Sequence, residues 1–380
     1  MSQAQTQPLA QASTGGDGDV TITAGGVTVG GWQEVRVTRG VERVPSDFDI
    51  KVTERNPDQS GTVVIEPFQP CVVRMGGDTV ITGYVDDYEP AIEPAGHTVR
   101  VSGRGKCQDL VDCSAIVPGM QMTTSSAVAL AQQLAQPFGI TTSSPLGTVS
   151  LKDQSGAPVQ FNVNLGETPF EIIDRVARYA QVLAFDSPDG NLVLDQVGRT
   201  TMASGFQQGV NIEAARCKFS ASERFSVYVA CIMSQQQFSQ IDGADGNTLG
   251  KVEDKAVPRY RPRVIISEQA TAAGYLALQR ARWEMARRIG RSQAVSLTCD
   301  SWRDSAGKLW EPNALALVHL PALKLVNQLW VIGEVTYRRG EDGTHADLLL
   351  MPPAAYQPEP SSLQLYAWQV GQGLQGGTAG

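Results

Sequence analysis

The sequence predicts a mainly β protein in which two small β-barrel domains flank a small α+β module. Apolar and polar residues alternate with a period of two in many short segments, as they do in half-buried strands. Turns rich in glycine and proline separate these segments at the spacing that small barrels show. Amphipathic helical patterns occur only in the middle of the chain and once in its second half.

Residues 20–105 are predicted to form the first barrel. Val35 and Val37 alternate with polar neighbours, and the same alternation continues through Phe48–Val52. Further strands are expected at Cys71–Met75, Thr79–Asp86 and His97–Ser102. The 19 residues before this region are rich in Gln, Ala, Ser, Thr and Gly, so we expect residues 1–19 to form a flexible tail.

Residues 106–200 are predicted to form the α+β module. A first helix is expected within Ser125–Phe138. A second helix begins after Thr168, since Thr168, Pro169 and Glu171 fit a capping box with proline at the first helical position. The apolar runs on either side of Asp189-Gly190 then predict a hairpin, because Asp-Gly favours a tight turn.

Residues 201–352 are predicted to form the second barrel, interrupted by a long helix at Glu268–Ile289. Its strands are expected at Ser226–Ser234, Arg263–Ile266, Gln293–Cys299, Ala314–Leu320, Leu329–Arg338 and Ala346–Met351. Residues 353–380 are rich in Pro, Gln, Ser and Gly and are expected to form a second flexible tail.

Composition argues against a polyanion-binding protein. The chain has 380 residues, a formal net charge of -8 and a hydrophobic fraction of 42%, enough for more than one core. Its 31 Lys and Arg residues are spread along the chain, so the basic footprint of a general DNA-binding protein is missing. Neither a signal peptide nor a membrane-spanning segment is expected, and folding in a cytoplasm is the prediction.

Metal centres and disulfides are not predicted. The six cysteines (Cys71, Cys107, Cys113, Cys217, Cys231, Cys299) contain no Cys-x-x-Cys pair, and the three histidines (His97, His319, His345) have no HExxH context. Free buried thiols fit this pattern better.

Several charged or glycine-rich segments are candidate sites. Asp86, Asp87, Glu89 and Glu93 form the densest acidic cluster, which could bind calcium but is better explained as strand-end surface charge. Asp109 and Asp112, beside Cys107 and Cys113, fit a linker or a first helical turn. The loop Gly246–Lys251 lacks the spacing of a phosphate-binding loop.

The long helix carries a basic stripe of Arg280, Arg287, Arg288 and Arg291. Such a stripe could contact nucleic acid or an acidic subunit, but a solvated or intersubunit face is the more common outcome. Glu167, Glu171 and Asp174 could serve a wall hydrolase, although charges at a helix start explain them better. The sequence therefore predicts no catalytic, cofactor-binding or metal-binding residues.

Three segments carry a family resemblance. Gly166–Glu171 (GETPFE) followed by Asp189–Leu192 (DGNL) resembles the baseplate hub proteins of contractile phage tails, the Mu-like hub and late control protein D family. Val35–Val52 and Val101–Ala115 are similar to the same group. The likeness spans most of residues 20–352.

The resemblance implies a structural protein rather than an enzyme. Hubs of this family are expected to form ring-shaped homotrimers that join the sixfold tail tube to the threefold central spike, with DNA passing through the lumen without specific binding. The implied partners are the spike, tube or tube-initiator proteins and baseplate wedge proteins. The implied location is the virion tail baseplate, after assembly in the host bacterial cytoplasm.

Two alternatives remain open from the sequence. One is a hub-associated cell-wall hydrolase. The other is the hub part of a type VI secretion-like spike, whose first part shares this architecture.

Overall fold

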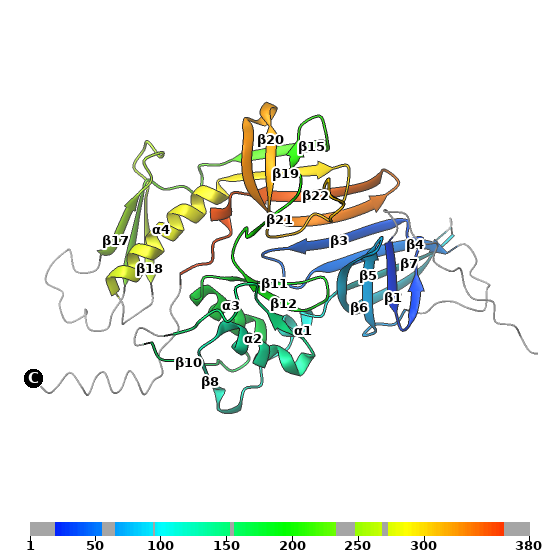
Figure 1. The fold of residues 1–380 in the computed structure, drawn as a ribbon, viewed down its shortest axis with the longest axis horizontal. Coiled ribbons are helices and arrows are strands. Elements are labelled where there is room, and N and C mark those ends of the chain that lie inside the picture. The colour runs from blue at the N-terminus through cyan, green and yellow to red at the C-terminus, as the bar shows by residue number, and fades with distance from the viewer. Residues whose placement is uncertain are drawn as a thin grey trace, which may run out of the picture.

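The computed structural model describes residues 20–54, 65–93, 96–152, 156–232, 248–267 and 273–360. Figure 1 shows a large sheet, a helical module beside it, and a smaller sheet with a long helix at one end of the molecule. The predicted tail 1–19 lies outside the described residues, as do residues 361–380 of the predicted tail 353–380. The mainly β fold class is confirmed.

Fourteen strands form the large sheet. They are β1 (Val20–Ala24), β2 (Val27–Val29), β3 (Glu34–Gly40), β4 (Asp47–Glu54), β5 (Pro70–Met75), β6 (Asp78–Glu93), β7 (Gly96–Gly105), β13 (Thr200–Thr201), β14 (Phe206–Gln207), β15 (Ile212–Phe219), β19 (Gln293–Cys299), β20 (Ala314–Leu320), β21 (Leu325–Gly340) and β22 (Gly343–Met351). The hydrogen-bonded order is β15-β19-β22-β21-β3-β4-β7-β6-β5-β1-β2, and β20 joins it through β21.

The two strand-rich regions meet where β3 pairs antiparallel with β21, placing Val37 opposite Tyr337. Within the described residues, the strand pairings do not close either region into a barrel. The predicted pair of barrels is therefore corrected to one continuous sheet. The physical reason is that each region alone would expose an edge of unpaired backbone groups, and pairing β3 with β21 satisfies both edges.

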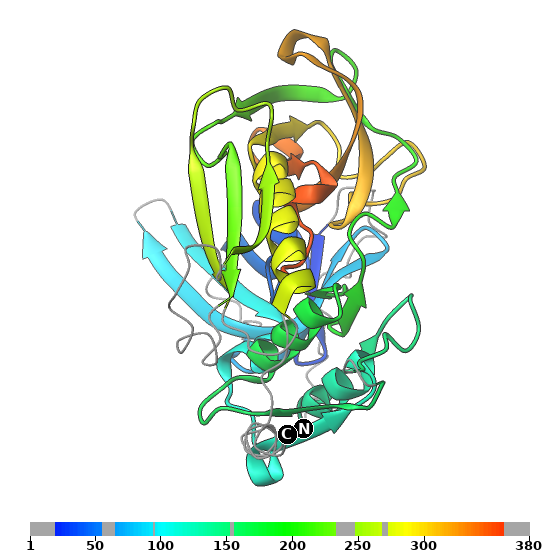
Figure 2. The ribbon, with the colours of Figure 1, turned by 90° about the vertical axis from the view of Figure 1, so that its left-hand side faces the viewer.

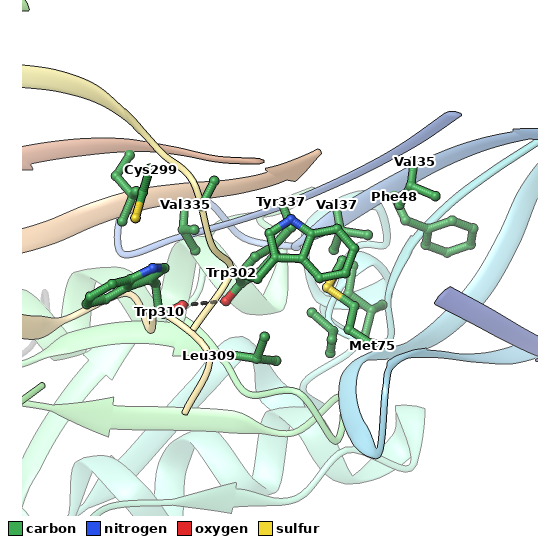
Figure 3. Packing of buried hydrophobic residues seen from close by; sticks show 14 of the residues in the cluster. Val35, Val37, Phe48, Met75, Cys299, Trp302, Leu309, Trp310, Val335 and Tyr337 are labelled. Atoms are coloured by element: carbon green, nitrogen blue, oxygen red, sulfur yellow. Dashed lines mark hydrogen bonds between the residues drawn. The ribbon is translucent and has the colours of Figure 1, made fainter. Parts of the chain in front are cut away.

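One core lies under both halves of this sheet. Figure 3 shows Val35, Val37 and Phe48 from the first half packed near Val335 and Tyr337 from the second. Trp302 stands edge-on to Tyr337, with ring centroids 6.4 Å apart. The Tyr337 hydroxyl donates a hydrogen bond to the carbonyl of Trp310. The shared core explains why the two halves do not behave as separate barrels.

The α+β module has its own core. Its elements are α1 (Gln108–Asp112), β8 (Gln121–Thr124), α2 (Ala127–Ala135), β9 (Thr142–Ser143), β10 (Val159–Asn162), α3 (Pro169–Tyr179), β11 (Leu183–Asp186) and β12 (Leu192–Asp195), with short 3₁₀ turns at Pro118–Met120 and Gln136–Phe138. Thr168 and Glu171 form the predicted capping box of α3. Ile172, Ile173 and Val176 of α3 are buried against α2 and the hairpin.

The smaller sheet has the strand order β17-β16-β18. Its strands are β16 (Val227–Ile232), β17 (Thr248–Glu253) and β18 (Pro262–Ser267), and α4 (Ala273–Arg291) packs on one side of it. Figures 1 and 2 show this unit projecting from the large sheet. Two further 3₁₀ turns lie at Pro321–Leu323 and Pro353–Ala355. Among the described helices, none combines the length and apolarity needed to span a bilayer.

Candidate functional site

One side of the large sheet points away from the core and is polar across seven neighbouring strands, β19 to β6. We call this surface the polar face; its members are Thr298, Asp347, Thr336, Arg338, Thr38, Arg36, Asp47, Asp49, Arg100, Ser102, Asp87 and Glu89. The alternation of side chains along the strands produces it, because Val35 and Val37 of β3 and Phe48 and Ile50 of β4 are buried in the core. A depression of about 590 Å³ lies on this face.

Ion pairs connect the strands of the first half of the polar face. Arg100 on β7 donates to both carboxylate oxygens of Asp49 on β4, at 2.8 and 2.6 Å. Arg36 on β3 reaches Asp47 at 3.2 Å and Asp49 at 3.8 Å. Hydrogen bonding from Arg100 holds the pKa of Asp49 below its ordinary value. The carboxylates of Asp47 and Asp49 are therefore neutralised by neighbouring guanidinium groups.

The network continues into the second half of the polar face. Thr38 and Thr336 share a hydrogen bond of 3.1 Å directly across the β3–β21 pairing. Asp347 on β22 accepts from Arg338 at 2.5 Å and from Thr298 at 2.7 Å. Each of the three guanidinium groups of the polar face, Arg36, Arg100 and Arg338, is thus paired with a carboxylate, which leaves none of them uncompensated for a polyanion.

The module is fixed to the large sheet by a buried carboxylate. Asp186 at the end of β11 is 4% exposed and accepts from the backbone N of Ser46 at 2.8 Å and from its Oγ at 2.9 Å. Burial raises the pKa of Asp186, while the charge of Arg39 and the Ser46 hydrogen bonds oppose that rise. Gly105 lies so close that a Cβ there would come within 2.8 Å of the Asp186 carboxylate. The module therefore has one defined position on the large sheet.

The basic stripe of α4 is occupied by other parts of this chain. Residues 353–359, which we call the C-terminal strap, run along α4 towards its first turn. Arg291 donates to the carbonyl of Ala355 at 3.2 Å, and Arg287 and Trp283 donate to the carbonyl of Gln357 at 3.2 and 2.8 Å.

Carboxylates form ion pairs with all four arginines of the basic stripe. Glu359 of the strap pairs with Arg280. Glu42 pairs with both Arg287 and Arg291, at 2.9 and 2.5 Å. The remaining member of the stripe, Arg288, pairs with Glu284 and Glu223 at 2.7 Å each. The sequence favours a solvated or intersubunit face for this stripe. The structure shows acceptors within this chain, because the strap and the β3–β4 turn bring carbonyl and carboxylate groups to these arginines.

Comparison with known proteins agrees with this architecture. Residues 19–105 match the family model of the N-terminal domain of Mu phage baseplate assembly protein GpP-like proteins. Residues 107–196 match the second domain of baseplate hub protein gp44-like proteins, and residues 273–359 match the fourth domain of Mu phage baseplate assembly protein GpP.

Whole-chain similarity is also high. The crystal structure of the 43 kDa tail protein of prophage MuSo2 from Shewanella oneidensis is 30% identical, with a TM-score of 0.78 over 89% of this chain and 100% of that chain. This chain belongs to the Mu-like baseplate hub protein family. Baseplate hub protein gp44 of Escherichia phage Mu is 28% identical over 88% of this chain and 87% of its own length.

A more distant likeness concerns the type VI alternative. An Escherichia coli component of the type VI secretion system is 10% identical, with a TM-score of 0.53 over 90% of this chain and 79% of that chain. At this identity the likeness shows a shared fold only. The Mu-like hub relatives are structural proteins of phage tails, and this chain is likewise a structural protein and not an enzyme.

The acidic residues singled out in the sequence have structural partners in this hub-family chain. Asp86 and Asp112 both accept from Arg104, at 2.7 and 2.9 Å, and Ser102 donates to Asp87 at 3.0 Å. Burial and the neighbouring Asp112 carboxylate raise the pKa of Asp109. The side chain of Glu93 lies outside the described residues.

The hydrolase candidates also have structural roles. Glu167 pairs with Arg175 at 3.1 Å, and Asp174 pairs with Arg178 at 2.8 Å. Glu171 belongs to the capping box of α3. The described residues contain no group of three or more His, Cys, Asp or Glu side chains placed to hold a metal ion.

The cysteine thiols and the described part of the glycine loop also have structural positions. Cys71, Cys107 and Cys299 are buried, and burial raises the pKa of Cys71 to about 12. Of the loop Gly246–Lys251, Gly250 lies in β17, where a Cβ would come within 2.6 Å of the α4 backbone. The first two residues of that loop lie outside the described residues.

Sequence reasoning missed three features. It did not identify the β3–β21 pairing, the hydrogen bonds from Ser46 to Asp186, or the strap along α4. The polar face had a visible signal, since charged residues alternate with valine and isoleucine in Val35–Val52. The three missed features each depend on contacts between residues far apart in the chain, so they have no local sequence signature.

Proposed function

We propose that this chain is the trimeric hub of a contractile phage tail, joining the sixfold tail tube to the threefold central spike. Three copies would form a ring in which the polar faces of the large sheets line the channel. The observation that carries this proposal is the single continuous sheet with an ion-paired polar face, built from both halves of the chain.

The chemistry of the polar face suits a channel through which DNA must pass. A wall that retains DNA needs cations that are free to replace counterions on phosphates. The guanidinium groups of Arg36, Arg100 and Arg338 are already paired with carboxylates. A trimer would also carry a formal charge of three times -8, or -24, which opposes retention.

Different segments of the chain would have different roles in this assembly. Residues 20–105 and 201–352 would build the ring, residues 106–200 would form the peripheral module, and residues 1–19 and the part of 353–380 that follows the C-terminal strap would be tails. The spike, the tube or its initiator, and the wedge proteins would be the partners. Assembly would take place in the host bacterial cytoplasm before incorporation into the virion.

The mass of the purified protein tests the trimer. Light scattering behind size exclusion should give three times 40.7 kDa, and negative-stain images of that peak should show rings. A chain that stays at 40.7 kDa alone and in the presence of purified spike protein would contradict the trimeric hub.

A further inference from the structure

A hollow of about 410 Å³ lies where the α+β module, α4, the β3–β4 turn and the C-terminal strap meet. Large apolar side chains from three elements line it: Phe170 of α3, Leu183 of β11 and Trp283 of α4. Each of the three is only partly buried. The volume falls within the roughly 300–1,000 Å³ range of binding pockets. We call this hollow the junction pocket.

The charges on the rim of the junction pocket are already paired. Three carboxylates line the pocket, and each forms an ion pair with an arginine of the same chain. The pairs are Glu42–Arg287, Asp174–Arg178 and Glu359–Arg280. A charged occupant would have to compete with these pairs, whereas an uncharged one leaves them intact. The pocket is therefore complementary to an uncharged, apolar occupant.

The walls of the junction pocket also suit a polypeptide backbone. Arg178 lines the pocket, and its Nε is buried without a hydrogen-bond partner in the described part of the chain. A backbone segment brings carbonyl acceptors to such a donor. The neighbouring wall already binds backbone in this way, because Arg287 and Trp283 both donate to the carbonyl of Gln357.

The chain itself leads to the junction pocket. Pro358 and Glu359 line it, and the described residues end at Pro360. Residues 361–380, which follow, contain no charged side chain. Within them, residues 363–370 (LQLYAWQV) are mostly large and apolar, so their burial is favourable. We call residues 363–370 the tail segment.

We propose that the tail segment docks into the junction pocket of its own chain, with its large apolar side chains against Phe170, Leu183 and Trp283. Leu365 is five residues beyond Pro360, and five residues of chain span up to about 18 Å. A tether this short raises the effective concentration of the segment at the pocket to about the millimolar range. The docked segment contacts α3, β11 and α4 together, so it holds the module against α4. The docking is independent of the trimer proposed above.

Hydrogen exchange of the full-length protein, followed by mass spectrometry, tests the docking. The backbone amides of the tail segment should exchange about tenfold or more slowly than those of a synthetic peptide with the same sequence. Phe170→Gln removes one apolar wall of the pocket and should restore fast exchange. Phe219→Gln is the matched control, because this phenylalanine is 57% exposed and does not line the pocket. Exchange of residues 353–359 in the same spectra shows whether the strap stays in place.

A variant of the tail segment supplies an independent measurement. Leu365→Gln/Trp368→Gln removes two large apolar groups and leaves every described residue unchanged, so it keeps the test valid if Phe170→Gln does not fold. Circular dichroism melts check the folding of all variants. The tail variant should exchange as fast as the free peptide. Leu374→Gln is its control, because this leucine lies beyond the tail segment.

Each outcome decides for or against the docking. A wild-type tail segment that exchanges as fast as the free peptide overturns it. Slow exchange that persists in a folded Phe170→Gln variant assigns the segment to another surface and also overturns it. Slow exchange that is lost on dilution assigns the segment to a neighbouring copy and overturns docking within one chain. A monomeric protein with a slowly exchanging, Phe170-dependent segment supports the docking while contradicting the trimer.

Discussion

Ser46 donates two hydrogen bonds to the carboxylate of Asp186, one from its backbone N at 2.8 Å and one from its Oγ at 2.9 Å, although 140 residues separate the two. Both residues are buried. This contact fixes the α+β module on the large sheet, and it makes the position of the module sensitive to a single side chain.

Replacing Asp186 with alanine should therefore destabilise the protein. The change leaves a buried N–H and a buried hydroxyl without their acceptor, which costs about 1–3 kcal/mol. Urea unfolding followed by circular dichroism measures the loss. Asp174→Ala is the control, because its ion pair with Arg178 is exposed and worth under about 1 kcal/mol. Equal losses in the two variants would contradict the role of Asp186.

A methyl group at Gly333 should displace the C-terminal strap. A Cβ at this position would overlap the buried Tyr356 hydroxyl, and overpacking of this kind costs about 1–3 kcal/mol. We expect Gly333→Ala to lower the melting temperature and to speed proteolytic cleavage after Tyr356. Gly77→Ala is the control, since a Cβ there has nothing within 4 Å. An unchanged cleavage rate would show that the strap does not need this glycine.

Stability should depend on the protonation of His345. The Asp342 carbonyl, which lies 2.8 Å from Nε2, and then the Glu213 carboxylate, 2.7 Å from Nδ1, raise the pKa of His345 above 6.5. Because the folded state binds this proton more tightly than the unfolded state, the stabilisation is complete below about pH 6.5 and is lost as pH rises through the raised pKa. Wild type should thus lose more stability than His345→Gln between pH 6 and 8.

Urea midpoints at both pH values measure that difference. His319→Gln is the control, because the imidazole of His319 hydrogen-bonds the neutral Asn327 side chain at 2.9 Å instead of a carboxylate. Parallel pH profiles for wild type and His345→Gln would exclude a stabilising proton on His345.

Adding cations to the polar face should make the hub retain DNA. Glu34, Asp87 and Glu89 are exposed carboxylates on or beside this face, and lysine at all three positions creates the uncompensated charge that phosphates need. We expect binding of a short duplex to tighten by about tenfold or more at low salt, with a steep salt dependence. Filter binding measures it.

The control for that variant moves the same charges elsewhere. Glu66→Lys/Asp174→Lys/Glu223→Lys changes three exposed or half-exposed carboxylates outside the polar face. If this control retains DNA as well as the polar-face variant does, net charge alone explains the effect and the polar face has no special relation to the channel.

Local elements followed closely from the sequence. The capping box of α3 and the hairpin β11–β12 were predicted at their observed positions, as were β19 and β20. The start of α4 was predicted at Glu268, whereas the described helix begins at Ala273. Each of these elements depends on side chains within a few residues of one another, so their signals survive in the linear sequence.

The assembly of those elements could not be predicted in the same way. The strand pattern of Glu34–Gly40 shows which side of β3 is buried but not that its free edge pairs with β21. The basic stripe of α4 showed where the cations lie but not that Glu42 and the strap would neutralise them.

The sequence by itself determined the period-two strands, the capped helices, the acidic balance of the chain and its resemblance to baseplate hubs. Tertiary structure alone decided that two strand-rich regions form one sheet, that Asp186 anchors the module through Ser46, and that Glu42 and the C-terminal strap pair with the basic stripe of α4. The physical reason is the distance along the chain over which each kind of interaction acts. Capping, turns and amphipathic periods are set by neighbours in the chain, whereas edge pairing and ion pairing are satisfied by whichever distant partner the common core brings within reach.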